Sequence, residues 1–117
     1  MNRGEIWLIN LDPTIGAEIR KVRPALLINH NDLGVLPLKI VIPITEYKAK
    51  YEIAPWMITI SPNSTNGLSK LSSIDTLQIR SVSIERFVKK IGEIDIVNLH
   101  KTEKALLKIL DIKSLVN

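Results

Sequence analysis

The sequence predicts a mainly β domain, a small and strongly bent sheet or barrel, with a single helix at its C-terminal end. Short segments rich in strand-forming residues, separated by turn residues, follow one another up to about residue 91. The segment after them has the spacing of an amphipathic helix. With 117 residues, 45% of them hydrophobic, the chain is expected to form one domain over residues 1–117 with a core of its own.

Three strands are predicted in the first half of the chain. Residues 5–11 are rich in strand formers, and residues 22–29 look buried on both faces. Pro24 lies near the start of the second strand, where a missing N–H is tolerated. Residues 39–45 form the third strand, and Pro43 within it predicts an edge position or a bulge.

The second half continues with further short strands. Residues 56–60 and 71–80 are predicted strands, the second because its apolar and polar residues alternate. Residues 83–87 are expected to form one helical turn, and residues 87–91 another strand.

An amphipathic helix is predicted from Asp95 to about Ile112. Asp95 is a suitable N-cap residue, and charged side chains fill one side of the segment. The other side carries apolar residues near spacings of three, four and seven, which are Ile96, Leu99, Leu106 and Leu110.

Composition and charge narrow the classes of function. The net charge is +4 and the isoelectric point is about 9.5, which fits either a polyanionic partner such as nucleic acid or a lysine-rich solvated surface. The absence of cysteine excludes disulfides and thiolate metal sites, and it fits a reducing compartment. The apolar runs are too short to cross a bilayer, so a cytoplasmic protein without a membrane partner is expected.

Familiar catalytic patterns are absent from the sequence. His30 lies in a turn cluster at residues 30–34, His100 lies on the predicted helix, and neither has a metal-like spacing to another ligand. There is no HExxH, Walker or nucleophile-elbow pattern. No metal or cofactor is therefore expected.

The stretch "GAEIRKVRP", residues 16–24, is the most highly charged candidate. Arg20, Lys21 and Arg23 can all hold phosphates, and arginine does so with a bidentate fork. Arg23 precedes a proline, which favours an extended backbone, and it stands at the mouth of an apolar strand.

Polar residues also lie at the ends of other predicted strands. Thr45 ends one strand, and Gln78 and Arg80 end another. Together with the charged stretch they fit two interpretations, a phosphate-binding site or ordinary polar groups that cap the sheet. The residue pattern alone leaves both open.

Three segments resemble one known family in order along nearly the whole chain. "RGEIWLINLDPTIGAEIRKVRPALLI", residues 3–28, resembles the N-terminal signature of MazF/PemK/Kid-type toxins of bacterial toxin–antitoxin pairs. "IVIPIT", residues 40–45, resembles the strand of that family that ends in threonine. "LQIRSVSIERFVKKIG", residues 77–92, resembles its Q-I-R-T-I-D segment and the strand after it.

The resemblance implies a fold and an activity. The fold is a small SH3-like barrel of the CcdB/MazF/Kid type with a C-terminal helix, usually as a homodimer. Typical members are endoribonucleases that cut single-stranded RNA without a metal. The 2′-hydroxyl attacks the adjacent phosphate and leaves a 2′,3′-cyclic phosphate and a 5′-hydroxyl. The expected partners are single-stranded RNA and a cognate antitoxin that is short, acidic and partly disordered.

The resemblance also implies roles for the residues that match the motifs. Arg23 would stabilise the extra negative charge of the transition state, and Thr45 would hold a non-bridging phosphate oxygen. Glu18 is the candidate general base in the opening loop.

Other matching residues would bind the substrate. Arg20 and Lys21 would anchor neighbouring phosphates, and Gln78 and Arg80 match the Q-I-R positions. The loops at residues 12–22 and 46–55 would frame the RNA groove. Three aromatic residues could stack on bases or pack within the protein, and they are Tyr47, Tyr51 and Trp56.

Departures from the family pattern leave other functions open. Ala17 stands where some relatives carry histidine, and Leu77 stands where many carry an acidic residue, with Asp75 two positions earlier. The alternatives are a CcdB-like toxin that poisons DNA gyrase through a protein interface, and a catalytically degenerate member that binds RNA or an antitoxin.

Overall fold

The computed structural model describes residues 1–33 and 35–113, and in these residues the strands form one bent antiparallel sheet. Gly34, in the predicted turn cluster, lies outside the described residues. The hydrogen-bonded order of the strands is β4-β5-β3-β2-β1-β7, and β6 also pairs with β3. The strands are β1 (Glu5–Asn10), β2 (Val22–Leu27), β3 (Leu38–Glu46), β4 (Met57–Ile60), β5 (Ser72–Asp75), β6 (Arg80–Ser83) and β7 (Phe87–Glu93).

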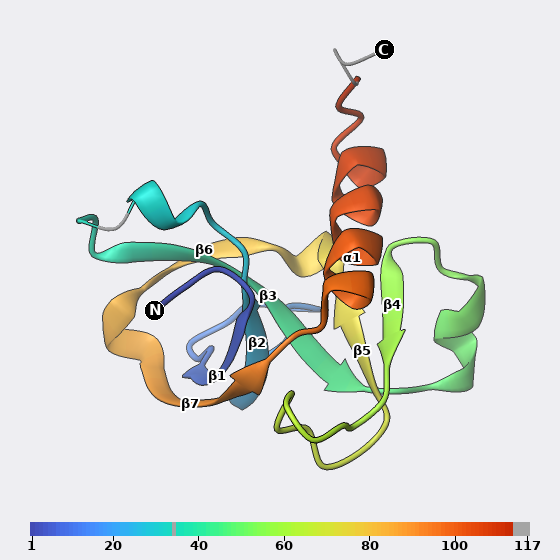
Figure 1. The fold of residues 1–117 in the computed structure, drawn as a ribbon, viewed down its shortest axis with the longest axis horizontal. Helices are drawn as coiled ribbons and strands as arrows, with labels where there is room; N and C mark the ends of the chain where they lie inside the picture. Colours follow the sequence, from blue (N-terminus) through green and yellow to red (C-terminus); the bar gives the residue numbers. More distant parts are fainter. Residues whose placement is uncertain (34, 114–117) are drawn as a thin grey trace.

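The sheet and the helix together confirm the predicted fold class. Figure 1 shows the strands curving around one another, with α1 standing at one end of the sheet beside β4 and β5. The strand order runs from β4 to β7 without closing on itself in the part of the chain that is described. The architecture is therefore barrel-like and mainly β, with one C-terminal helix.

Strand β3 joins the two halves of the sheet. It pairs with β2 on one side, and on its other side it pairs first with β6 and then with β5. The prediction that Pro43 marks an edge strand is wrong, because β3 is central. Pro43 lies between the residues paired with β6, which end at Val41, and those paired with β5, which begin at Ile44. The missing N–H thus falls where the neighbouring strand changes.

The single strand predicted over residues 71–80 is divided in the structure. Ile74 pairs with Ile44 and Arg80 pairs with Val41, so this segment uses more residues than β3 does over the same distance. A 3₁₀ turn over Thr76–Gln78 takes up the excess. Apolar and polar residues alternate through the turn as they do in the strand, so the sequence pattern does not reveal where the strand is interrupted. The helical turn predicted at residues 83–87 is confirmed as a 3₁₀ turn at Ile84–Arg86.

Apolar side chains pack on both faces of the sheet. One core lies toward α1 and β4, and its fully buried members include Ile6, Leu26, Ile42, Ile44, Ile60 and Ile74. A second core lies on the opposite face, and it consists of Ile9, Leu11, Ala25, Leu27, Val41 and Val82. Strands covered on both sides explain why residues 22–29 read as a continuous apolar run.

Helix α1 spans Ile96–Ile109, and Asp95 caps it as predicted. The Asp95 carboxylate accepts the backbone N–H of Asn98 at 3.0 Å, which satisfies one of the free donors of the first turn. No helix in residues 1–33 and 35–113 is long and apolar enough to cross a membrane.

The buried face of α1 differs from the predicted one at both ends. Leu99 and Leu106 pack against the core as expected, and Thr102 is fully buried between them. The Thr102 hydroxyl donates to the Asn98 carbonyl at 2.8 Å, so its burial leaves no unpaired polar group. Ile96 and Leu110 are exposed, and the buried residues of the helix, Thr102 and Ala105, lie nearer its middle.

Candidate functional site

A cleft of about 300 Å³ opens where β2 and β3 meet the segment between β4 and β5. Arg23 of β2 and Thr45 of β3 both line it, as the sequence predicted. Two further basic residues, Lys70 and Lys89, and the acidic residue Glu46 also line the cleft. Its lining comprises Leu8, Arg23, Pro24, Ile44, Thr45, Glu46, Gly67, Leu68, Ser69, Lys70, Ser72, Lys89 and Ile91.

Strand register explains why Arg23 and Thr45 meet. Ala25 lies opposite Pro43 in the antiparallel β2–β3 pair. Two residues further along each strand, the same register carries Arg23 toward Thr45 on the same face of the sheet. Ser73 of β5 lies opposite Thr45 on its other side. A charged guanidinium and a hydroxyl are therefore held by rigid strands at one mouth of the cleft.

Two glycines bring the far wall of the cleft against the sheet. A Cβ at Gly67 would lie 2.0 Å from the backbone oxygen of Ile91, and a Cβ at Gly92 would lie 2.4 Å from that of Thr65. The segment 61–71 and β7 therefore touch backbone to backbone. The Glu93 N–H donates to the Thr65 carbonyl at 2.9 Å and fixes this contact.

Besides Arg23, the charged residues of the cleft are Glu46, Lys70 and Lys89. The sequence analysis missed both lysines, and it included Glu46 only as the first residue of a loop that frames the groove. Lys70 Nζ lies 3.4 Å from a carboxylate oxygen of Glu46, and both side chains are largely exposed. Lys89 comes from β7. The position of Glu46 directly after Thr45 was the one local signal in the sequence. The two lysines reach the cleft through strand pairing and the glycine contact, which no local pattern reveals.

The loop between β1 and β2 carries the charged stretch, and side chains from the β5–β7 region hold it. Arg80 donates to the Leu11 carbonyl at 2.9 Å, and Arg86 donates to the carbonyls of Asn10 and Asp12. Burial lowers the pKa of Arg80, and the nearby Glu18 carboxylate partly opposes that shift. Arg80 and Arg86 therefore hold the backbone of residues 10–12 by hydrogen bonds.

Gln78 is also bound to the loop. Its side-chain oxygen accepts the Ile19 N–H at 2.7 Å, and its side-chain nitrogen donates to the Ala17 carbonyl at 3.0 Å. Both ends of the amide are therefore engaged. The predicted roles of Gln78 and Arg80 in substrate binding stay predictions, and the contacts in the structure are to the protein itself.

Glu18 lies apart from the cleft. Its carboxylate accepts the Ile15 N–H at 2.6 Å. Glu18 lines a different hollow, together with Ala17, Leu77, Gln78, Ile79 and Arg80. The structure therefore places the predicted general base beside Arg80 and not among the residues that line the cleft.

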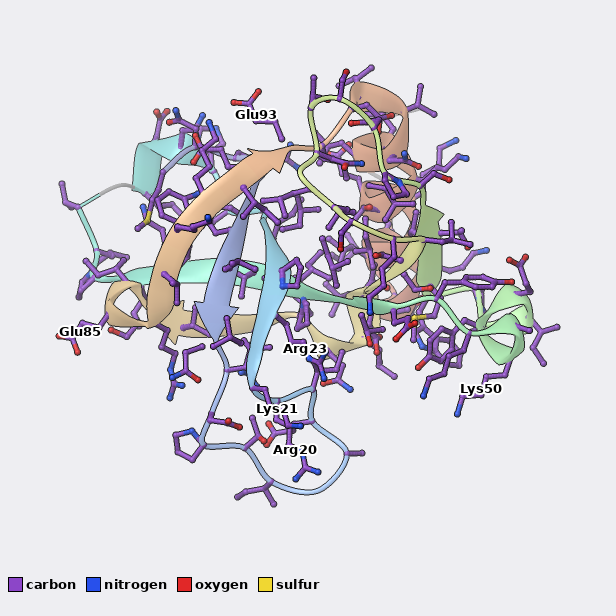
Figure 2. The ribbon with its side chains drawn as sticks, turned by 90° about the horizontal axis from the view of Figure 1, so that it is seen from below. Arg20, Lys21, Arg23, Lys50, Glu85 and Glu93 are labelled. Atoms are coloured by element: carbon purple, nitrogen blue, oxygen red, sulfur yellow. The ribbon has the colours of Figure 1, made fainter. Side chains whose placement is uncertain are left out.

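Arg20 and Lys21 lie where the loop joins β2. Figure 2 shows both side chains out on the loop, whereas Arg23 lies back beside the sheet. Both are exposed. Lys21 adopts a left-handed backbone conformation with φ of 70°, and its carbonyl accepts the Leu11 N–H at 2.9 Å. This turn sends the Arg20 carbonyl toward Arg23, whose Nε–H donates to it at 3.2 Å.

The predicted aromatic contacts lie in the connection after β3. The Tyr47 hydroxyl donates to the Glu52 carboxylate at 2.8 Å, and this bond raises the pKa of Tyr47. Lys50 Nζ lies 5.8 Å from the centre of the Tyr51 ring, within range of a cation–π contact. Base stacking by Tyr47, Tyr51 and Trp56 stays a prediction.

The missing acidic residue at Leu77 is not replaced by Asp75 at the surface. Leu77 is exposed, whereas Asp75 is 6% exposed. Burial raises the pKa of Asp75, although nearby backbone N–H groups of Leu77 and Gln78 oppose the shift. Within the described residues, one carboxylate oxygen of Asp75 and the Ser73 hydroxyl are buried without a hydrogen-bond partner. Asp75 is therefore a buried residue at the end of β5, paired with Met57 of β4.

Comparison with known proteins gives consistent matches over almost the whole chain. It is 32% identical over 120 residues to the endoribonuclease MazF9 of Mycobacterium tuberculosis, covering 97% of this chain and 99% of that protein. It is 32% identical over 108 residues to the endoribonuclease EndoA of Bacillus subtilis, covering 91% and 90%. The fold is similar to that of MazF from Deinococcus radiodurans, with a TM-score of 0.80, 23% identity, and 96% and 97% of the two chains covered.

A second solved structure with this fold is a mycobacterial endoribonuclease in complex with its cognate antitoxin, with a TM-score of 0.77 and 16% identity over 97% and 98% of the two chains. The family model described as "PemK-like, MazF-like toxin of type II toxin-antitoxin system" matches residues 2–110. The motifs, the fold and these matches agree, and the chain belongs to the PemK-like, MazF-like toxins of type II toxin–antitoxin systems.

Proposed function

We propose that this protein is an endoribonuclease toxin that cleaves single-stranded RNA, including mRNA, in the cleft between β2, β3 and the segment 61–71. The observation that carries the proposal is the meeting of Arg23 and Thr45 in one cleft with Lys70 and Lys89. Three cations around one hydroxyl suit a phosphodiester, which is negatively charged and accepts hydrogen bonds. The two relatives compared above are endoribonucleases by name.

The reaction is an internal transfer of the phosphoryl group. The 2′-oxygen of the RNA forms a bond to the adjacent phosphorus, and the bond from phosphorus to the 5′-oxygen of the next nucleotide breaks. The products are a 2′,3′-cyclic phosphate and a 5′-hydroxyl. A proton leaves the 2′-hydroxyl and a proton reaches the departing 5′-oxygen. Arg23 neutralises the negative charge that builds on the phosphorane, while Thr45 donates to a non-bridging oxygen.

Glu46 is the proton acceptor that the cleft offers. Glu46 lines the same cleft as Arg23, whereas Glu18 lines the hollow beside Arg80. Lys70 at 3.4 Å can hold the Glu46 carboxylate in place. We therefore assign proton acceptance to Glu46 ahead of Glu18. Glu46→Gln should remove the acidic limb of the pH–rate profile, and an identical effect of Glu18→Gln alone would reverse the assignment.

The protruding loop supplies further phosphate contacts. Arg20 and Lys21 are exposed where the loop joins β2, close to Arg23 in the chain. Neither takes part in an ion pair within the described residues. Charges of this kind anchor RNA without reading its sequence.

A cognate antitoxin with an acidic, partly disordered segment is proposed to neutralise the toxin by covering this basic region. A similar fold is known in complex with its antitoxin. We also propose a homodimer in the cytoplasm. Exposed apolar side chains at Leu36, Leu38 and Ile40 provide apolar surface for a second copy. Light scattering on the purified protein measures the assembly directly.

The test of the function is incubation of the purified protein with a mixed pool of single-stranded RNA in EDTA, followed by end-group analysis. Cyclic phosphate and 5′-hydroxyl ends are expected. Fragments with 3′-hydroxyl ends, or cleavage that requires an added divalent metal, would contradict the mechanism. RNA binding without cleavage would identify a degenerate member. Gyrase-dependent DNA breaks with intact RNA would identify a gyrase poison.

A further inference from the structure

The Gln78 side chain is matched to the backbone of the charged loop at two points. Its oxygen accepts the Ile19 N–H at 2.7 Å and its nitrogen donates to the Ala17 carbonyl at 3.0 Å. Ile19 itself packs against the second core. The amide therefore fixes residues 17–19 over η3, the 3₁₀ turn at Thr76–Gln78, in the manner of one strand pairing with another.

The fixed loop leads directly to the cleft arginine. The next carbonyl after Ile19 is that of Arg20, and it accepts the Nε–H of Arg23 at 3.2 Å. The left-handed turn at Lys21, with φ of 70°, sets the direction between the two residues. A guanidinium held at Nε has a defined plane, which leaves its two terminal nitrogens for a bidentate contact with phosphate.

We infer that Gln78 is a positioning residue for Arg23, acting through the backbone of residues 17–20. The inference rests on the proposed function for its catalytic consequence. Its structural part, the orientation of Arg23 by the loop, is independent of any activity. The two hydrogen bonds engage one N–H and one lone pair of the amide, so the loop backbone sets the orientation of the Gln78 side chain.

A glutamine is well suited to this position. The contact needs one acceptor and one donor at the end of the same side chain, which an amide provides and a carboxylate does not. Gln78→Glu keeps the volume and the acceptor for the Ile19 N–H, but it places an oxygen against the Ala17 carbonyl. Gln78→Met keeps the approximate length and removes both hydrogen bonds.

The first measurement is the solvent-exchange rate of the Arg23 Nε–H, observed by NMR and assigned by its loss in Arg23→Lys. Both Gln78 variants should speed exchange, by at least about fivefold in Gln78→Met. Thr102→Val is the matched control, because it also removes a side chain–backbone hydrogen bond but lies on α1. An exchange rate unchanged in folded Gln78→Glu and Gln78→Met would overturn the inference. If Gln78→Met does not fold, the Glu variant alone decides.

The second measurement is steady-state RNA cleavage by the same variants. Misplacement of Arg23 should lower kcat by about ten- to a hundredfold, with KM changed by less than about threefold. A rise in KM with kcat unchanged would show that Gln78 binds substrate and would overturn the inference. A wild-type protein that cleaves no RNA would refute the proposed function, while the exchange rates would still decide the positioning of Arg23.

Discussion

Replacing Gly67 with alanine should destabilise the protein far more than the same replacement at Gly16. Both glycines have positive φ, +71° at Gly67 and +59° at Gly16, so alanine costs about 1–2 kcal/mol of backbone strain at either position. They differ in what the new methyl group meets. At Gly16 nothing lies within 4 Å of it, whereas at Gly67 it would lie 2.0 Å from the Ile91 oxygen and 2.6 Å from the Ile91 carbonyl carbon.

The atoms in the way at Gly67 belong to backbone and cannot rotate aside. The segment 61–71 must therefore move from β7, at an overpacking cost of about 1–3 kcal/mol. That movement also strains the hydrogen bond from the Glu93 N–H to the Thr65 carbonyl at 2.9 Å, which contributes about 1 kcal/mol. The expected loss for Gly67→Ala is about 3–6 kcal/mol, against about 1–2 kcal/mol for Gly16→Ala.

Urea unfolding, followed by circular dichroism at several protein concentrations, measures both losses. Gly67 and Leu68 line the cleft, so the Gly67 variant should also lose RNA cleavage under conditions where it remains folded. Equal free energies of unfolding for Gly67→Ala and Gly16→Ala would refute the backbone contact on which the cleft wall depends.

Three further predictions concern charge and capping. Asp75→Asn should stabilise the protein at neutral pH: burial raises the folded-state pKa of Asp75, so its contribution is present at low pH and is lost as pH rises through that pKa. Urea unfolding between pH 3 and 7 checks this, and parallel stability curves for both proteins would contradict it. Asp95→Ala should cost about 1 kcal/mol by removing the α1 cap, measured by thermal unfolding, and an unchanged melting temperature would refute the cap. Replacing Arg20 and Lys21 with serine should reduce the slope of log affinity against log salt for a single-stranded RNA by about 1.4; an unchanged slope in filter binding would remove both from the contact surface.

The fold was predictable where one local pattern dominated. The strand at residues 5–11, the turn at residues 83–87 and the cap at Asp95 are set by residues close in sequence, and the structure confirms them. The predictions were wrong where the structure of a segment depends on residues far away in the sequence. The break within residues 71–80 follows from the change of neighbour along β3. The exposure of Ile96 and Leu110 depends on how α1 packs on the rest of the protein, which the helical spacing does not specify.

The candidate site was predictable in part for the same reason. Arg23 lies near the start of β2 and Thr45 near the end of β3, and the antiparallel pairing of these strands brings the two residues together. The sequence analysis placed both in one site, and both line the cleft. Glu18 is only five residues before Arg23 in the chain, yet it lines a different hollow, beside Arg80. Lys89 enters the cleft because β7 pairs with β1, and Lys70 follows a segment that touches β7 backbone to backbone at Gly67 and Gly92. A contact of that kind has no signature in the local sequence.

We propose Arg23 and Thr45 as the reacting centre of a ribonuclease. Its most direct test is the single-turnover cleavage rate of an end-labelled single-stranded RNA in EDTA, compared among the wild type, Arg23→Ala and Thr45→Val. Each variant should remain folded, bind RNA, and cleave at least about a hundredfold more slowly than the wild type. Cleavage by folded Arg23→Ala at the wild-type rate would place the chemistry outside this cleft and contradict the claim.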